Sequence, residues 1–227
     1  MSEIEQRLQQ VSESLPVILD RLVFVGGGVT EILISDSAGR KPRPTEDLDC
    51  IIELASRVEY YKVEEHLRKA GYRNDPSIPP ILCRWIKESL ILDVMPTLEE
   101  ILGFTNIWYR DAVVHPLRFA LPNGLSVNII HPVYFFATKT EAFRSRGRED
   151  FRASHDFEDI VALVNGRAEL VPEMKNAEQK VLKAMREFWL PKMESANMTA
   201  SIKEHLDAYE DVERMPIVVD RFKEMLK

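Results

Sequence analysis

Short apolar runs separated by turn residues fill the first part of the chain, and this pattern constrains the fold more than any other feature. Runs of this length bounded by glycine, proline and polar residues are typical of buried strands. The predicted strands cover residues 22–25, 48–54, 82–86 and 90–95, and further short strands are expected between 111 and 130 around Asn123-Gly124. Helical spacing of apolar residues predicts helices over residues 3–20, 58–70 and 132–146. The chain therefore begins as a mixed α/β structure.

The C-terminal part carries only helical patterns. The predicted helices there cover residues 154–165, 174–190, 198–209 and 211–226. With 227 residues, 45% of them hydrophobic, the chain can bury one sizeable core and carry a smaller helical appendage. We therefore predict an α/β (α+β) fold with a mixed sheet flanked by helices. Residues 1–150 would form the first domain, including the N-terminal helix, and residues 151–227 an α-helical C-terminal region.

Composition and charge argue against several classes of protein. No stretch approaches the roughly 20 uncharged apolar residues that cross a bilayer, and the polar start MSEIEQRLQQ does not resemble a signal peptide. We therefore expect a cytoplasmic protein with no membrane partner. Cys50 and Cys83 are the only cysteines and have no metal-binding spacing, so reduced, inert thiols are expected. A net charge of -7 argues against a surface devoted to nucleic acid, although a local basic groove can exist on an acidic protein.

Acidic residues on two predicted strands are the main candidates for chemistry. Asp47 and Asp49 are two residues apart at the start of a strand, so both carboxylates project from the same face. Asp93 lies within the apolar segment 90–95, where an unpaired charge would be costly. If the two strands are neighbours, three carboxylates converge and can hold two Mg²⁺ ions, with Mn²⁺ as the alternative. A purely structural explanation is also open, in which Asp93 pairs with an arginine or a backbone cap.

Three successive glycines end the first predicted strand. Gly26, Gly27 and Gly28 lie between that strand and a short helical segment, where backbone N–H groups can contact a phosphate. The same residues can also serve as ordinary turn residues. The pattern is neither a Walker A nor a GxGxxG motif, and no lysine follows it. The sequence therefore fits poorly with an ordinary P-loop or a dinucleotide-binding site.

Together these motifs resemble the nucleotidyltransferases of the AbiEii/AbiGii toxin type, members of the DNA polymerase β-like superfamily. The resemblance covers about residues 20–166. The matching positions are the glycine turn with Thr30, the segment 45–49, Asp93, Lys139, Arg146 and the segment 155–160. The resemblance implies a nucleotidyltransferase-type mixed sheet flanked by helices, with residues 1–150 as the catalytic domain. It also implies an enzyme that moves a nucleoside monophosphate from an NTP to an acceptor hydroxyl with the help of Mg²⁺.

The resemblance also implies roles for individual residues. In such enzymes the two acids after the glycine turn and the later acid bind the metals, which assigns metal binding and catalysis to Asp47, Asp49 and Asp93. The residues expected to bind the nucleotide are Gly26, Gly27, Gly28, Thr45 and Lys139, with Lys139 contacting the triphosphate. The residues expected to orient the lysine or the acceptor are Arg146, Asp156 and Asp159.

The acceptor is not identified by these motifs. One hypothesis is transfer to tRNA or another RNA by a toxin-like enzyme, with an antitoxin protein as partner. A second is transfer to a protein hydroxyl or a small molecule. A third is a non-catalytic nucleotide-binding or partner module on the same fold, which the three acids argue against. A basic cluster favours an RNA acceptor, unless it is a self-paired solvated helix face; it comprises Lys139, Arg144, Arg146, Arg148 and Arg152.

Aromatic residues and one histidine are weaker candidates. Trp85, Trp108 and Tyr109 can either stack a base or pack in the core, and packing is the favoured interpretation. His155 can be a general base or a surface residue at a helix start, and the surface role is favoured. A metal-bound aspartate can deprotonate the acceptor instead, with Asp93 the choice by analogy with the superfamily.

Overall fold

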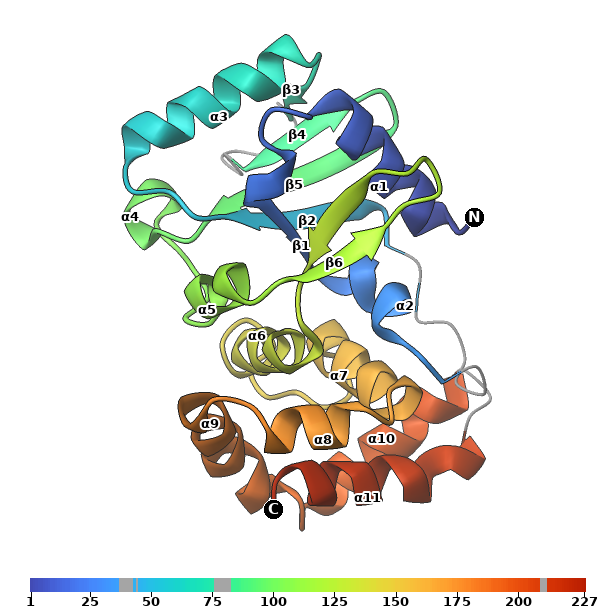
Figure 1. Cartoon of the computed structure of the whole chain (residues 1–227). Helices are drawn as coiled ribbons and strands as arrows, with labels where there is room; N and C mark the ends of the chain where they lie inside the picture. Colours follow the sequence, from blue (N-terminus) through green and yellow to red (C-terminus); the bar gives the residue numbers. More distant parts are fainter. Residues whose placement is uncertain (37–42, 44, 76–82, 209–211) are drawn as a thin grey trace. The chain divides into compact units, whose positions relative to one another are not determined.

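A computed structural model describes residues 1–36, 43, 45–75, 83–208 and 212–227 of the chain (Figure 1). It divides into two compact units. The first unit comprises Met1–Val29 and Pro44–His131, and the second comprises Thr30–Arg43 and Pro132–Lys227. The division after His131 differs from the predicted boundary after residue 150, because it assigns the predicted helix at 132–146 to the second unit. Most of the loop at 36–44 lies outside the described residues.

The first unit is built on a seven-stranded mixed sheet with the strand order β3-β4-β5-β2-β1-β7-β6. Its strands are β1 (Leu22–Val25), β2 (Asp47–Ile52), β3 (Arg73–Asn74), β4 (Arg84–Lys87), β5 (Leu90–Pro96), β6 (Leu117–Ala120) and β7 (Ser126–Ile129). β2 runs parallel to β5, and β1 runs parallel to β7, whereas the other neighbours are antiparallel. All residues of β1 are buried, as expected for a central strand. The predicted mixed α/β class is therefore confirmed.

Helices of the first unit are α1 (Glu3–Ser14), α3 (Arg57–Lys69), α4 (Glu99–Leu102) and α5 (Tyr109–Val114). A capping box formed by Ser2 and Glu5 starts α1. The predicted helix over residues 3–20 is too long, because α1 ends before Pro16. The proline ring disfavours helical geometry at Leu15, the residue before it. A short 3-10 turn, Leu19–Arg21, then leads into β1.

Two hairpins place the outer strands. β4 and β5 are joined by Glu88 and Ser89, and the positive φ of 54° at Glu88 suits a tight turn. β6 and β7 pair around the predicted Asn123-Gly124 turn, where Gly124 has φ 83°. The sequence did not indicate the helices α4 and α5 that lie between the two hairpins.

The second unit is entirely helical in its described residues. Its helices are α2 (Thr30–Leu33), α6 (Pro132–Arg144), α7 (His155–Gly166), α8 (Leu170–Lys175), α9 (Gln179–Trp189), α10 (Ala196–Ala208) and α11 (Met215–Met225). The single helix predicted over 174–190 is wrong. Asn176, whose residue type has low helix propensity, caps α8, and α9 begins only at Gln179.

An aromatic cluster forms the core of the second unit around α6, which contacts α7, α8 and α9. Its fully buried members are Phe136, Phe143, Phe157, Trp189 and Phe222. The indole Nε1 of Trp189 donates a hydrogen bond of 3.0 Å to Thr140 Oγ1, so burial of this ring leaves its polar atom satisfied. Within the part of the chain that the structure describes, no helix is both long and apolar enough to cross a membrane.

Candidate active site

Strand pairing brings the three candidate carboxylates onto one face of the sheet. In the parallel pair of β2 and β5, Asp49 lies directly opposite Asp93. Asp47 is two residues before Asp49 on the same strand, so its side chain leaves the sheet on the same face. Asp93 is buried, with 8% of its surface exposed, and the other two are half-buried. The condition set by the sequence, that the two strands be neighbours, is met.

The glycine turn lies against the acidic strand. β1 pairs with β2 so that Val25 is opposite Asp49, and Gly26 follows with φ 73°. A Cβ atom at Gly26 would lie 1.9 Å from Oδ2 of Asp49. Only glycine leaves room for this carboxylate and also accepts the left-handed backbone conformation. The turn and one candidate metal ligand are therefore packed in direct contact.

Thr45 and Gly28 form the next contact along this edge. A Cβ atom at Gly28 would lie 3.2 Å from Thr45 Oγ1 and 3.3 Å from the carbonyl oxygen of Asp47. Thr45 Oγ1 donates to that same carbonyl at 3.3 Å. Arg7 on α1 donates to the Thr45 carbonyl oxygen at 2.5 Å. The predicted nucleotide-binding residues of the first unit thus surround the start of β2.

Arg84 on β4 lies among the acids, and the sequence analysis did not select it. Arg84 is the register partner of Asp93 on the antiparallel strand. Its guanidinium donates to Asp93 twice, from Nε to Oδ1 at 2.9 Å and from Nη2 to Oδ2 at 2.7 Å. Nη2 also donates to Oδ2 of Asp47 at 2.8 Å. These contacts raise the pKa of Arg84 above its ordinary value, chiefly through the hydrogen bond to Asp93.

A signal for Arg84 was available in the sequence. The predicted strands 82–86 and 90–95 form a hairpin, and a two-residue turn at 88–89 fixes the pairing of the residues before and after it. Counting outward from that turn places Arg84 opposite Asp93. The structural explanation considered for Asp93, pairing with an arginine, therefore describes one of its contacts.

The donor chemistry of this cluster fits a hard divalent cation, because carboxylate oxygens are the ligands that Mg²⁺ prefers. The side-chain positions do not form a closed ligand cage. Among the described residues, no three His, Cys, Asp or Glu side chains are placed to hold one metal ion. Arg84 contacts two of the three acids instead. The register of β2 and β5 thus brings three carboxylates to one face of the sheet, and the guanidinium of Arg84 supplies a positive charge beside two of them.

Both thiols lie close to the acidic face without taking part in it. Cys50 on β2 and Cys83 before β4 are free and buried. Burial raises the pKa of Cys50 well above its ordinary value and that of Cys83 to about 12, with the nearby aspartates adding to both shifts. Such thiols stay protonated and unreactive at neutral pH, in agreement with the prediction.

Lys139 and the acid pair of the resemblance lie in the second unit. Lys139 on α6 is buried, and its Nζ lies 3.2 Å from Asp156 and 2.5 Å from Asp159 on α7. Arg146 binds Asp156 through two hydrogen bonds of 2.8 and 2.7 Å. Burial tends to raise the pKa of Asp156, but the hydrogen bond from Arg146 and the charge of Lys139 outweigh it, and the net pKa is lowered. Both acids therefore contact Lys139, and Asp156 also contacts Arg146.

The remaining arginines of the basic cluster are mostly paired within the protein. Arg144 contacts Glu141 at 2.9 Å, and Arg152 contacts Glu204 at 2.7 Å. Both arginines are more than half exposed. This arrangement matches the self-paired, solvated face considered as the alternative to an RNA-binding surface.

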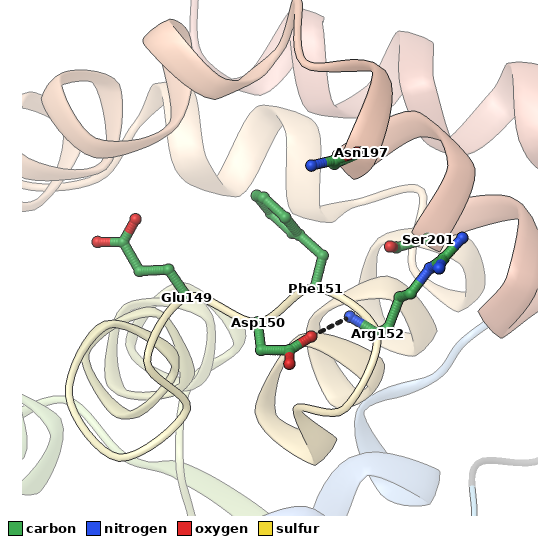
Figure 2. A pocket seen from close by; sticks show the side chains of 6 residues that line it. All are labelled: Glu149, Asp150, Phe151, Arg152, Asn197 and Ser201. Carbon is green, nitrogen blue, oxygen red and sulfur yellow. Dashed lines mark hydrogen bonds between the residues drawn. The ribbon is translucent and has the colours of Figure 1, made fainter.

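A pocket of about 300 Å³ opens beside this segment in the second unit (Figure 2). It is lined by Glu149, Asp150, Phe151, Arg152, Asn197 and Ser201. Figure 2 shows the Asp150 carboxylate accepting a hydrogen bond from the Arg152 backbone N–H, at 3.0 Å. The residues predicted to bind nucleotide or metal do not line this pocket.

The positions of the aromatic and histidine candidates agree with structural roles and not with base stacking or catalysis. Trp85 is fully buried and Trp108 is 8% exposed, which leaves neither ring available to stack a base. Tyr109 is half-buried, and its hydroxyl lies 3.7 Å from the sulfur of Met95. The side chain of His155 is 73% exposed and contacts Glu158. The favoured interpretations of packing and of a surface histidine agree with these positions.

Comparison with known proteins supports the fold. The chain is similar over 99% of its length to the crystal structure of an antigenic nucleotidyltransferase-like protein from Paracoccidioides brasiliensis, of which it covers 94%. The TM-score is 0.53 and the sequence identity is 14%. A scan against protein-family models finds no match, and a search of the curated proteins finds none either. The fold is therefore nucleotidyltransferase-like.

Proposed function

We propose that the protein is a metal-dependent nucleotidyltransferase that moves a nucleoside monophosphate from an NTP to an acceptor hydroxyl. The observation that carries the proposal is the register of β2 and β5, which sets Asp49 opposite Asp93 with Asp47 on the same face. The glycine turn in contact with Asp49 supports it further. The nucleotidyltransferase-like fold is consistent with this chemistry, although a fold alone does not specify a reaction.

In this proposal Asp47, Asp49 and Asp93 hold the Mg²⁺ ions, or Mn²⁺ in their place. Bound at carboxylates, such ions neutralise phosphate charge and lower the pKa of a nearby hydroxyl. Asp93 is the general base that accepts the proton of the acceptor hydroxyl. The acceptor oxygen then forms a bond to the α-phosphorus of the NTP, and the bond to pyrophosphate breaks.

The glycine turn and Thr45 bind the phosphates. Backbone N–H groups of Gly27 and Gly28 are the donors to the phosphate oxygens, since Gly26 lets the chain turn against Asp49 without a side chain in the way. Thr45 provides a hydroxyl at the edge of the same turn. These contacts position the nucleotide relative to the acids, and positioning is a large part of catalysis of phosphoryl transfer.

Lys139 has a supporting role in this proposal. Its ammonium group is held by Asp156 and Asp159, and Arg146 is anchored on the first of these acids. We assign contact with the triphosphate to Lys139 on the resemblance to AbiEii-type enzymes. The acid pair would fix the lysine side chain in one conformation and reduce the entropy lost on binding the nucleotide.

The acceptor class is proposed on the same resemblance. The first hypothesis is that the acceptor is tRNA and that the protein is a toxin-like enzyme with an antitoxin as partner. The second hypothesis is that the acceptor is a hydroxyl of a protein or a small molecule. The paired state of Arg144 and Arg152 lowers the number of cations that can meet RNA phosphates without first breaking an internal ion pair.

A second candidate function rests on Arg84. An acidic cluster whose charge is compensated by an internal guanidinium can persist in a protein that binds nucleotide or a partner protein and performs no transfer. Under this hypothesis the protein binds a nucleotide or a partner protein, and divalent metal has no role.

The deciding experiment incubates the protein with each α-³²P-labelled NTP, Mg²⁺ and total cellular RNA, and then resolves label in RNA, protein and small-molecule fractions. The test variant is Asp47→Asn/Asp49→Asn, which removes two charges with little change in shape. The matched control is Asp20→Asn, because Asp20 is an exposed aspartate of the same unit, paired with Arg118 away from the cluster.

Metal-dependent label in one fraction, lost in the double variant and kept in Asp20→Asn, would support the transferase and identify its acceptor class. Equal label from the double variant would overturn the assignment of the acids. Nucleotide binding without label in any fraction, with or without metal, would favour the binding module.

A further inference from the structure

We propose that Arg84 is an internal counter-ion that competes with divalent cations for the carboxylates of the candidate site. This inference rests on the proposed metal binding and deepens it. Arg84 makes three hydrogen bonds of 2.7 to 2.9 Å to Asp93 and Asp47, two of the three residues assigned to the metal. Guanidinium and metal therefore require the same oxygen atoms.

The geometry of the contact explains why the two cations exclude each other. Asp93 uses both carboxylate oxygens to accept the guanidinium fork, and Asp47 uses Oδ2. A cation bound to these oxygens would bring two positive groups within a few ångströms, which is unfavourable in a partly buried site. Side-chain exposures of 20% for Arg84 and 11% for Asp93 leave little water to screen that repulsion. The metal must therefore displace the guanidinium.

Charge balance explains why an arginine is present at all. Without a metal, three carboxylates on one face of two adjacent strands would repel one another, at a cost to the stability of the sheet. Arg84 neutralises part of that charge from the neighbouring strand β4. Its side chain is long enough to leave the cluster without any movement of the strand. The arginine thus stabilises the metal-free protein and sets a threshold of metal concentration for loading the site.

The test measures Mn²⁺ binding directly, from the electron paramagnetic resonance signal of free Mn²⁺ titrated with protein. Arg84→Gln removes the competing charge, and we expect Mn²⁺ to bind at least about tenfold more tightly, because the three charge-assisted hydrogen bonds of Arg84 no longer have to be broken. In EDTA the same variant should have a lower Tm than the wild type, and a larger rise in Tm with Mn²⁺.

Two further variants control for nonspecific effects. Arg118→Gln removes an arginine of strand β6 that pairs with Asp20, and it should leave Mn²⁺ affinity unchanged. Arg84→Lys keeps a positive charge but loses the bidentate fork, and its affinity should lie between those of wild type and Arg84→Gln. This conservative variant also serves as the test if Arg84→Gln does not fold.

Mn²⁺ affinity of Arg84→Gln or Arg84→Lys that equals or falls below the wild-type value would overturn the inference and leave the proposed metal site standing. Absence of Mn²⁺ binding in the wild type and in every Arg84 variant would overturn both. Tighter binding in the variants without any nucleotide transfer would support the counter-ion and count against the transferase.

Discussion

Gly26 lies against the side chain of Asp49 in the candidate site. The carboxylate of Asp49 occupies the position that a side chain at Gly26 would need, and the backbone at Gly26 has φ 73°. Each feature alone disfavours any residue but glycine. Together they couple the turn expected to hold phosphate to one of the acids expected to hold metal.

Gly26→Ala should destabilise the protein by about 2–4 kcal/mol, because backbone strain of roughly 1–3 kcal/mol is added to a steric clash. The measurement is the free energy of unfolding from urea denaturation. In the background of Asp49→Ala the same substitution should cost less, because the clashing carboxylate is absent.

Gly103→Ala is the matched control for this prediction. Gly103 has φ 80°, close to the value at Gly26, and a Cβ atom there would meet nothing within 4 Å. Its substitution therefore reports the cost of the left-handed backbone alone. Equal losses of stability at the two glycines would show that the Asp49 contact contributes nothing.

At the scale of elements, α6 and α7 are joined by polar contacts as well as by aromatic packing. Lys139 of α6 and Arg146 beyond its end both bind Asp156 in the first turn of α7. An acid in that position also interacts favourably with the helix dipole. Asp156 is therefore the carboxylate that links both cations to α7, and Asp159 is a second acid that Lys139 contacts there.

Asp156→Asn should destabilise the protein by about 3 kcal/mol at pH 7, because it leaves the buried ammonium of Lys139 with one fewer anionic partner. Because the folded-state pKa of Asp156 is lowered, its contribution is present above the ordinary value of 3.8 and is lost as the pH falls below it. Urea denaturation of both proteins at pH 7 and pH 3 measures this difference, which should narrow at the lower pH.

Glu204→Gln is a suitable control, because it breaks an exposed pair with Arg152 in the same unit. It should change stability little at either pH. A difference between wild type and Asp156→Asn that stays constant from pH 7 to pH 3 would contradict the assignment of the ion pair to Asp156.

For the molecule as a whole, burial of weak acids in the first unit predicts a loss of stability in alkali. Burial is the main cause that raises the pKa values of Cys50, Tyr60, Tyr72 and Cys83, the last to about 12. Unfolding restores ordinary values near 9 for the thiols and 10 for the tyrosines. The unfolded chain therefore loses its protons first as the pH rises, and stability is full only below about pH 9.

The urea midpoint should accordingly stay level from pH 7 to about pH 9 and fall steadily towards pH 11. Cys50→Ala/Cys83→Ala should lower the midpoint at pH 7, because both thiols are packed in the core, but should flatten its decline above pH 9. A wild-type midpoint that is constant up to pH 11 would contradict burial of these groups.

Local sequence signals were sufficient for most elements of the fold. The helix at 57–69 and the hairpin at Asn123-Gly124 follow from capping, periodicity and turn chemistry, each of which acts over a few residues. The errors have local causes too. Pro16 ended a helix that apolar periodicity alone would have continued, and a cap at Asn176 divided another.

The candidate site depends on contacts that local sequence signals do not determine. The spacing of Asp47 and Asp49 alone places two carboxylates on one face, because side chains alternate along a strand. Asp93 joined them only through the pairing of β2 with β5, more than forty residues apart in the chain. The register of the β4–β5 hairpin, which the sequence indicated, places Arg84 opposite Asp93. The hairpin pattern does not show that the guanidinium also reaches Asp47.

By itself the sequence determined the mixed α/β class and the helical C-terminal part and selected the candidate acids, since these depend on backbone preferences and on patterns within single elements. Only the tertiary structure decided which charges meet. It paired Arg84 with two of the acids and buried Lys139 between Asp156 and Asp159. The physical reason is that the energy of a charge depends on its neighbours in space and on its exposure to water, and neither is set until the whole chain has packed.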